Sequence, residues 1–429
     1  MTADRPQSTR ALFRDRNFTR YLLARIFATT GLQMQSVAVG WQVYDLTGKY
    51  TDLGFVGLAQ FIPFVSLVLF AGQLADRLNR RWIVIACYFV EICGSLALLA
   101  FSLSGIRVVW PIFLVAAVFG ATRAFIMPTT QSMLPNLVSV ELFPRAIALN
   151  SSTFQLSMIV GPAIAGLLFN FGTPVVYGAI AGLSALALLL MILMSYRQTL
   201  AEAAESTMHS LFEGLRFVRS RSTVLGAISL DLFAVLFGGV TALLPAYAKD
   251  VLHLGAEGLG WLRTATGVGA ALMAMALTVT PIYRHVGRWM FGGVALFGVT
   301  TIVFGLSTSF TISLLALVLL GAGDMVSVYV RQILVQLETP DRIRGRVSAV
   351  SSVFIGASNE LGEFRSGMTA TLFGLIPSVV LGGVATLVVT LLWTVLFPSL
   401  ARMHSFPSHA LESPRPAEAE RPSRRASPS

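Results

Sequence analysis

The chain has 429 residues, of which 55% are hydrophobic and 12% are charged, and its formal net charge is +10. Soluble globular domains carry about 25% charged residues, so this composition excludes an ordinary water-soluble fold. Apolar runs of about 20 residues recur from end to end, which is the length that spans a bilayer as a helix. The alternating pattern of membrane β-strands is absent, so we expect an all-α membrane protein.

The apolar runs predict twelve transmembrane helices. Their approximate limits are 19–43, 53–75, 82–103, 108–129, 146–170, 174–195, 223–248, 257–281, 290–307, 311–334, 347–370 and 377–400. The chain then divides into a cytoplasmic N-terminal segment (1–18), a six-helix bundle (19–195), a polar linker (196–222), a second six-helix bundle (223–400) and a disordered cytoplasmic tail (401–429). Within the linker, Leu211, Leu215 and Val218 recur at helical spacing. This spacing predicts an amphipathic helix that lies on the membrane surface.

Arginine and lysine are distributed unequally between the two sets of loops. One set holds Arg77, Arg80, Arg81, Arg145, Arg197, Arg221, Arg288 and Arg344, whereas the other holds Lys49, Arg107, Lys249 and almost nothing else. The positive-inside rule therefore predicts that both termini are cytoplasmic. Topology and contact with anionic membrane lipids account for the basic excess, so nucleic acid is not an expected partner.

Two stretches of the sequence resemble each other. The residues from Gly120 align without a gap with those from Gly321, and the alignment matches Gln131 with Gln332 and Arg145 with Arg346. Each stretch runs from a predicted outward-to-inward helix through a turn into the next helix. Two related six-helix halves are the organisation of one class of transporters.

Residues 72–81 read GQLADRLNRR, between the second and third predicted helices. They resemble the signature G-x-L-A-D-R-x-G-R-R of the major facilitator superfamily, with Asn79 at the usual glycine, and Asn tolerates a left-handed turn. GPAIAG at 161–166 resembles the antiporter signature G-P-x-x-G-G, with Ala165 at one glycine. TPDRIRGRV at 339–347 is similar to the exporter branch that includes the enterobactin exporter and macrolide efflux proteins.

The resemblance implies twelve helices in two pseudo-symmetric bundles within a bacterial cytoplasmic membrane. It also implies a conformational clasp on the inner face, in which Asp76 pairs with an arginine and a helix end. Gly72, Arg77, Arg80 and Arg81 belong to the same segment. The alternative is a solvated loop that only obeys the positive-inside rule.

The motif at 161–166 contributes a proline-kinked helix. Gly161, Pro162 and Gly166 permit close packing at the interface between the halves, and this packing would seal a leak path. A simple packing role is the alternative.

Ionisable residues inside predicted helices are candidates for function, because an unpaired charge is costly in lipid. Arg123 and Asp324 occupy equivalent positions in the two repeated stretches, with opposite charge. We expect them to form a gate pair that is closed when the cavity faces outward, or else each to pair within its own half.

Three other acidic residues in the predicted helices are candidates for proton coupling, together with Asp324. Asp231 in apolar surroundings can titrate near neutrality and carry a proton, unless it forms an ion pair with Arg25 or another cation. Glu360 and Glu363 share a helix face and form a second candidate proton site.

Neutral polar and aromatic residues in the predicted helices are candidate contacts for a cargo. They are Gln33, Gln35, Gln60, Gln131 and Phe233. The glutamines could instead bond between helices, and the phenylalanine could face lipid or the core. On the outer side, Asp45 and Lys249 suit an outer gate, with a solvated loop as the alternative.

The sequence has no nucleotide-binding loop of Walker type, no metal cluster and no nucleophile triad, so we expect neither an enzyme nor a bound cofactor. We predict a monomeric secondary transporter that exports a small drug- or siderophore-like molecule, amphipathic or aromatic, by alternating access in exchange for protons. Its partners are then the substrate, protons and membrane lipids. The alternatives are a lipid or lysolipid translocase on the same fold and a membrane sensor that transports nothing.

Overall fold

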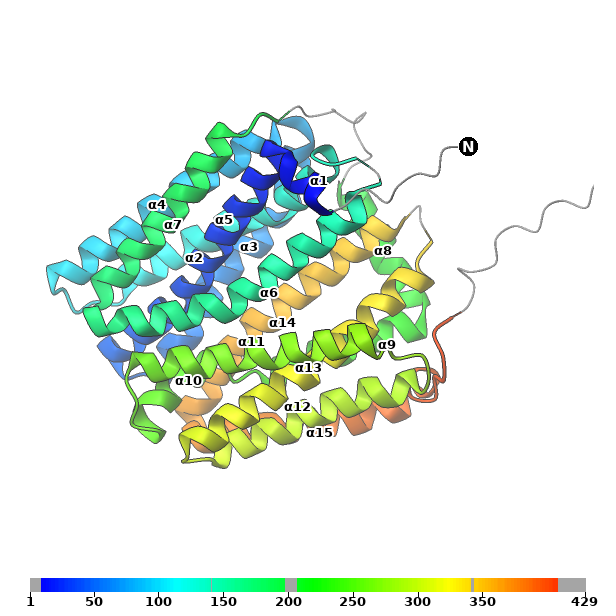
Figure 1. The fold of residues 1–429 in the computed structure, drawn as a ribbon. Coiled ribbons are helices and arrows are strands. Elements are labelled where there is room, and N and C mark those ends of the chain that lie inside the picture. The colour runs from blue at the N-terminus through cyan, green and yellow to red at the C-terminus, as the bar shows by residue number, and fades with distance from the viewer. Residues whose placement is uncertain (1–8, 140, 197–206, 341–342, 408–429) are drawn as a thin grey trace, which may run out of the picture.

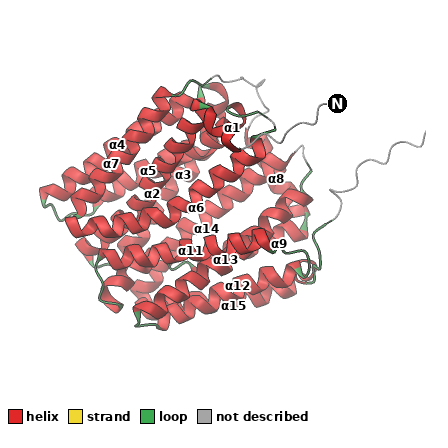
Figure 2. Ribbon diagram, viewed as in Figure 1, coloured by secondary structure: helices red, strands yellow, loops and turns green. Residues whose placement is uncertain are grey.

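Long helices joined by short turns make up nearly all of the computed structural model (Figures 1 and 2). It describes residues 9–139, 141–196, 207–340 and 343–407, and these ranges contain no β-strand. The all-α prediction is therefore confirmed. The candidate residues Asp76 and Arg77 lie in a described helix, but their side chains, like that of Leu211, lie outside what the structure describes.

The chain forms two groups of helices separated by α8. The first group is α1 (Thr9–Arg14), α2 (Arg16–Thr47), α3 (Tyr50–Arg77), α4 (Arg80–Ser104), α5 (Trp110–Met133), η1 (Leu134–Asn136), α6 (Phe143–Leu168), η2 (Phe169–Phe171) and α7 (Thr173–Leu193). The intervening helix is α8 (Thr207–Ser220). The second group is α9 (Ser222–Gly238), η3 (Thr241–Leu243), α10 (Leu244–Ala246), η4 (Tyr247–Val251), α11 (Ala256–Val279), α12 (Val286–Leu306), α13 (Phe310–Glu338), α14 (Arg344–Phe373), α15 (Leu375–Leu396) and α16 (Pro398–Ala401).

Twelve of the described helices have 17 residues or more, six in each half. Ten described stretches are long and apolar enough to cross a membrane by themselves. The long helices α2 and α14 are missing from those ten, because arginine, glutamine and glutamate interrupt their apolar runs. Polar groups at membrane depth are tolerated where a helix faces other helices or a cavity.

The two halves repeat one packing scheme. In the N-terminal half α3 packs on α5, α4 on α7 and α2 on α7; in the C-terminal half α11 packs on α13, α12 on α15 and α9 on α15. The interface between the halves repeats the scheme as well, because α3 packs on α14 and α6 packs on α11. The structure therefore consists of two pseudo-symmetric six-helix bundles, as predicted.

The seventh span differs from the continuous helix predicted over 223–248. Helix α9 ends at Gly238, and the chain continues through the short elements η3, α10 and η4. A Cβ on Gly238 would lie 2.5 Å from the ring of Phe297 and from Thr386, so only glycine permits this approach. Gly239 then has an extended backbone, with φ −65° and ψ 109°. The hydropathy of residues 223–248 does not predict this break.

Helix α8 lies within the segment where the sequence predicts an amphipathic helix, but its apolar face is not free. Val218 is 2% exposed and packs with residues of α9, α13 and α14. Glu213 forms an ion pair with Arg346, at the start of α14. Phe212 and Leu215 remain exposed. The Val218 side of α8 therefore docks on the C-terminal half, and contact of the exposed side with the membrane surface stays a prediction.

The segment predicted as a disordered tail begins with structured residues. The backbone N–H of His285, before α12, donates to the carbonyl of His404 at 2.6 Å, and Gly287 donates to Met403 at 3.0 Å. Residues 402–407 therefore pack against the turn before α12. The rest of the predicted tail, 408–429, and the first eight residues lie outside the described ranges.

The two ends of the bundle differ in charge and in packing. We call the end with the turns after α3, α7, α11 and α13 the basic end, because arginines gather there, and the other the opposite end (Figure 1). Toward the opposite end one hydrophobic cluster contains residues of both halves, such as Val43 and Tyr247. At the basic end the clusters are separate, one with Tyr21 and Met191 and another with Trp393.

Candidate functional site

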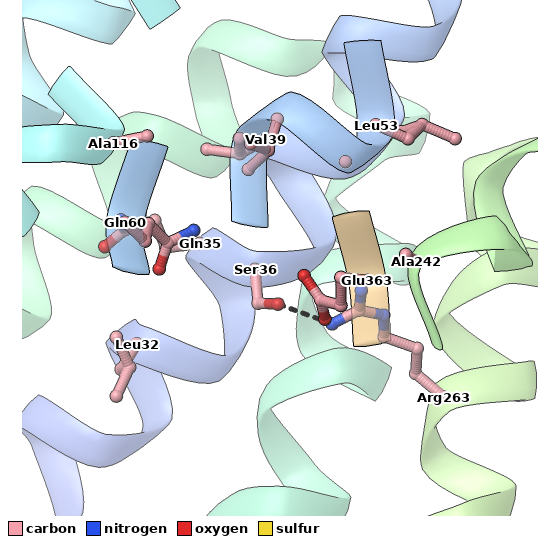
Figure 3. Close-up of a pocket in the computed structure, with 12 residues that line it drawn as sticks. Leu32, Gln35, Ser36, Val39, Leu53, Gln60, Ala116, Ala242, Arg263 and Glu363 are labelled. Atoms are coloured by element: carbon pink, nitrogen blue, oxygen red, sulfur yellow. Dashed lines mark hydrogen bonds between the residues drawn. The ribbon is translucent and has the colours of Figure 1, made fainter. Parts of the chain in front are cut away.

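A pocket lies between the halves and takes residues from both (Figure 3). Its polar lining residues are Gln35 and Ser36 of α2, Gln60 of α3, Arg263 of α11 and Glu363 of α14. The remaining lining residues are small or aliphatic: Leu32, Val39, Gly40, Leu53, Val56, Ala116 and Ala242. The pocket therefore combines an aliphatic wall with a few convergent polar groups, and such polar groups fix the orientation of a ligand in small-molecule sites.

Arg263 links the halves inside this pocket. Its guanidinium donates a hydrogen bond to the Ser36 hydroxyl of α2 and another, at 3.4 Å, to the Thr241 carbonyl (Figure 3). The Arg263 Nε is buried and has no hydrogen-bond partner within the described part of the chain. The terminal nitrogens each make one hydrogen bond, so each keeps one further N–H donor.

Glu363 reaches the pocket where α3 and α14 approach closely. A Cβ on Gly57 would lie 3.1 Å from the Glu363 Oε2, so the glycine leaves room for the carboxylate. Within the described ranges the Glu363 carboxylate has neither a hydrogen bond nor an ion pair. Its charge does interact with those of Arg263, Arg123 and Glu360 at longer range. Glu363 is thus a carboxylate in the pocket that lacks a direct partner.

Arg123 pairs with Glu360 in the described conformation, and the Arg123–Asp324 gate pair, which is expected only with the cavity facing outward, is not formed there. Arg123 Nη1 and Glu360 Oε1 are 2.8 Å apart, and the guanidinium lies 5.8 Å from the ring centre of Phe64. The alternative of a partner within the same half does not hold for Arg123, because α5 and α14 belong to different halves. The α3–α14 packing explains the choice, since it carries Glu360 to the interface.

Asp324 lies instead in a second, smaller pocket inside the C-terminal half, together with Asp231 and Ser327. Arg331 Nη2 lies 3.4 Å from the Asp231 Oδ2, and the Ser327 hydroxyl donates to Oδ1 at 3.2 Å. Asp231 therefore forms an ion pair with a cation other than Arg25. Both partners are almost fully buried, with 4% of the Arg331 side chain and 7% of the Asp231 side chain exposed.

Arg25 stays within the N-terminal half. Its Nη1 donates to the Thr130 hydroxyl of α5 at 2.7 Å, and the Tyr21 hydroxyl donates to the Thr130 carbonyl at 2.8 Å. An ion pair between Arg25 and Asp231 is absent from the described contacts. In this conformation Arg25 binds α2 to α5 and does not bridge the two halves.

The arginines of the signature segment cap helix ends. Arg80 Nη1 donates to the Ser132 carbonyl at 2.9 Å, and Arg81 Nε donates to the Met191 carbonyl at 2.9 Å. Cations at a helix C-terminus are favoured by the helix dipole. Asn79 does not use its tolerance of a left-handed turn: its φ is −65°, and its side chain accepts a hydrogen bond from the backbone N–H of Arg81 and so caps the N-terminus of α4. The backbone of Gly72 is helical, within α3.

The GPAIAG segment packs in two directions. A Cβ on Gly166 would lie 2.9 Å from the Cα of Gly260, so α6 and α11 touch there across the interface between the halves. The Pro162 carbonyl also lies against Gly260. Gly161 faces Gln33 of α2 within its own half instead. The close approach requires small residues on both helices, and its role in sealing a leak path stays a prediction.

The predicted cargo contacts fall into two groups. Gln35 and Gln60 line the central pocket, whereas Gln33 packs against α6. Gln131 is exposed near the basic end of α5 and does not line the pocket. Phe233 packs in the core of the C-terminal half, with its ring centre 5.2 Å from that of Trp393. The prediction that Phe233 belongs to a cargo wall therefore finds no support in the position of its ring.

The opposite end is closed by contacts between the halves. Lys249 Nζ and Asp45 Oδ1 are 2.6 Å apart, which agrees with the expected pairing across the outer side. The Tyr44 hydroxyl of α2 also donates to Asp250, in η4. These polar contacts lie beside the hydrophobic cluster that both halves share. Together they join the bundles at this end.

Arg263 is a pocket residue that the sequence analysis missed. It lies within the predicted span 257–281, so the cost of an unpaired charge in lipid applies to it as it does to Arg123. The position of an arginine inside an apolar run was therefore a sufficient signal. What the sequence does not give is its contact with Ser36, which depends on the packing of α11 near α2.

The fold occurs in many solved transporters. A bacterial homologue of the human lysosomal transporter Spinster, in an inward-facing and unoccupied conformation, superposes with a TM-score of 0.69 at 16% identity, covering 90% of this chain and 96% of that one. A D-xylose–proton symporter superposes with a TM-score of 0.70 at 12% identity, covering 91% and 99%.

Comparison of sequences finds relatives with a higher identity than these structures and identifies the family. The enterobactin exporter EntS of Citrobacter koseri is 25% identical over 401 residues, which cover 91% of this chain and 94% of the exporter. EntS of Shigella boydii is 24% identical and covers 92% and 95%. The family described as transmembrane secretion effector matches residues 7–424. The chain therefore belongs to this family of the major facilitator superfamily and is a multi-pass membrane transporter, not an enzyme.

Proposed function

We propose that the protein exports a small amphipathic or aromatic molecule from the cytoplasm by alternating access, in exchange for protons. The observation that carries the proposal is the central pocket with Arg263 and Glu363, which lies between two bundles joined at one end. At the basic end the bundles keep separate cores. A pocket that reaches one side of the membrane at a time is what alternating access requires.

The basic end would face the cytoplasm of a bacterial cell, because arginines concentrate there and cytoplasmic loops carry the basic excess. Both chain ends would then be cytoplasmic. With the opposite end closed, the described conformation would be inward-facing. The similarity to the Spinster homologue, whose structure is described as inward-facing, supports this interpretation.

Proton coupling needs a carboxylate that can gain and lose a proton as the transporter moves. Asp231 is ion-paired with Arg331 and Glu360 with Arg123, so neither carboxylate lacks a cationic partner. Glu363 and Asp324 have no direct partner among the described residues. Glu363 also faces the central pocket, so we favour it over Asp324 as the residue where proton and cargo meet.

The cargo class follows from the pocket and from the relatives. The pocket offers an aliphatic wall and a few hydrogen-bonding groups, Gln35, Ser36 and Gln60, which suits a molecule with an apolar body and polar substituents. Relatives that share about a quarter of their residues with this chain are named enterobactin exporters. An export direction and a siderophore- or drug-like cargo are consistent with both.

Transport into inverted membrane vesicles tests the proposal. A panel of enterobactin, an aromatic dye and a naphthyl amino acid is offered while respiration acidifies the vesicle interior. We expect uptake of at least one compound, loss of that uptake when an ionophore collapses the pH gradient, and the same loss in Glu363→Gln. Glu91→Gln is the matched control, because Glu91 lies on α4, away from the pocket. Uptake that survives the collapse of the gradient would rule out proton antiport.

A further inference from the structure

The central pocket holds two opposite charges that do not pair directly with each other. Arg263 comes from α11 and Glu363 from α14, and both side chains line the same cavity (Figure 3). Their charges interact, but no ion pair joins them in the described structure. In a nearly apolar environment two such groups would gain from direct contact. Both side chains line the pocket and neither is fully buried, so a ligand in the pocket can contact each of them.

Each of the two side chains has unused bonding capacity. Each terminal nitrogen of the Arg263 guanidinium makes one hydrogen bond to a described residue, which leaves one further N–H on each. The carboxylate of Glu363 has no donor within hydrogen-bond distance in the same part of the chain. A guanidinium suits an acidic group, and a carboxylate suits an ammonium group.

We propose that the substrate is a zwitterionic amphiphile, whose acidic group binds Arg263 and whose ammonium group binds Glu363. The proposal rests on the proposed function, since it takes the central pocket as the cargo site. The apolar body of the substrate would lie against the aliphatic wall formed by Leu32, Val39, Leu53 and Val56.

Charge balance is the reason to prefer a zwitterion over a singly charged ligand. An anion that binds Arg263 would lie near the carboxylate of Glu363, and a cation that binds Glu363 would lie near the guanidinium of Arg263. Like charges repel strongly where water is scarce. A zwitterion places a negative charge next to Arg263 and a positive charge next to Glu363, and it leaves the net charge of the pocket unchanged.

The same geometry links the substrate to the proton. A proton on Glu363 removes the negative charge that would hold the ammonium group, so the proton and this part of the substrate exclude each other. When the proton and the substrate exclude each other at one site, the transporter exchanges one for the other across the membrane and does not carry both in the same direction. Arg263 would keep its charge throughout and hold the acidic end, because a guanidinium stays protonated in proteins.

Binding to the purified full-length protein in lipid nanodiscs tests this inference. Four ligands share one apolar body: naphthylalanine as the zwitterion, naphthylpropionate as the anion, naphthylethylamine as the cation and naphthylethanol as the neutral compound. Ligand affinity is read at neutral pH from the rise in unfolding temperature with ligand concentration. We expect naphthylalanine to bind about tenfold more tightly than each of the others, which corresponds to about 1.4 kcal/mol.

Two variants test which pocket residue binds which charged group of the ligand. Arg263→Gln should remove the advantage of the acidic group, so that naphthylalanine binds no better than naphthylethylamine. Glu363→Gln should remove the advantage of the ammonium group, so that naphthylalanine binds no better than naphthylpropionate. The controls are Arg107→Gln in an exposed turn and Glu91→Gln on α4, which should both keep the preference of the natural protein.

Several results would overturn the inference: equal affinity for naphthylethanol, a preference for either singly charged ligand, no binding of any of the four, or a zwitterion preference that survives in both pocket variants. These results concern binding alone and leave proton-driven export to the vesicle experiment. Conversely, a zwitterion preference without proton-driven transport would overturn the proposed function and leave the ligand class intact.

Discussion

Arg123 of α5 and Glu360 of α14 form an ion pair between the two halves, with Nη1 and Oε1 2.8 Å apart. The glutamate side chain is 10% exposed and the arginine side chain is 37% exposed. Glu360 also lies one helical turn from Glu363, on the same face of α14. The pair therefore joins the halves next to the candidate proton site.

The first prediction concerns this pair. Arg123→Glu and Glu360→Arg, made singly, each place like charges at the interface and should reduce transport at least about tenfold, the effect of about 1.4 kcal/mol. The two changes made together restore opposite charges and should recover most of the activity. The measurement is initial uptake into inverted vesicles, normalised to protein amount.

A matched double variant separates this pair from the one suggested by the internal repeat. Arg123→Glu combined with Asp324→Arg should not recover activity, because Asp324 lies in a different pocket. Recovery by that combination, together with no recovery by the Arg123–Glu360 exchange, would contradict the pairing.

The second prediction concerns the buried Asp231–Arg331 pair. Arg331→Gln removes the cation and leaves the carboxylates of Asp231 and Asp324 around one small pocket. Breaking a buried pair by removing one partner costs about 3 to 5 kcal/mol, so the unfolding temperature in detergent should fall markedly. Ser327→Ala removes a single hydrogen bond to Asp231 and should cost only about 1 kcal/mol. Equal effects of the two variants would argue against a stabilising ion pair.

The third prediction concerns the contact of α6 with α11. Gly166→Ala would bring a Cβ to within 2.9 Å of the Gly260 Cα, which is backbone and cannot rotate away. Such overpacking costs about 1 to 3 kcal/mol and should separate the halves locally. Gly182→Ala on α7 is the control, because its Cβ would meet nothing within 4 Å and alanine favours a helix. We expect loss of transport in the first variant only, with both proteins present in the membrane.

The sequence predicts the helices of this protein better than it predicts which side chains pair between them. An apolar run of sufficient length can satisfy its backbone in lipid only as a helix, so the spans follow from composition. The rotation of each helix about its axis is set by packing between distant segments. The repeat therefore suggests Asp324 as the partner of Arg123, whereas the approach of α14 to α3 at Gly57 brings Glu360 instead.

Hydropathy also does not predict local breaks in the helices. At Gly238, where α9 ends, Phe297 and Thr386 of other helices leave no room for a Cβ, and no window of neighbouring residues contains them. The N-cap at Asn79 shows the opposite case, because Asn is a strong capping residue and needs no distant partner, although the sequence pattern was interpreted only as tolerance of a left-handed turn.

The fourth prediction concerns orientation in the membrane. In a background without the native cysteines, a single cysteine replacing Arg288 lies at the basic end, and one replacing Arg107 lies at the opposite end. If the basic end is cytoplasmic, a membrane-impermeant maleimide should label the Arg107 position in intact cells and the Arg288 position only in inverted vesicles. A third cysteine at Leu78, in the turn after α3, should behave like the one at Arg288, because the two turns occupy equivalent places in the two halves. Labelling of the Leu78 and Arg288 positions from different sides would be incompatible with two parallel halves.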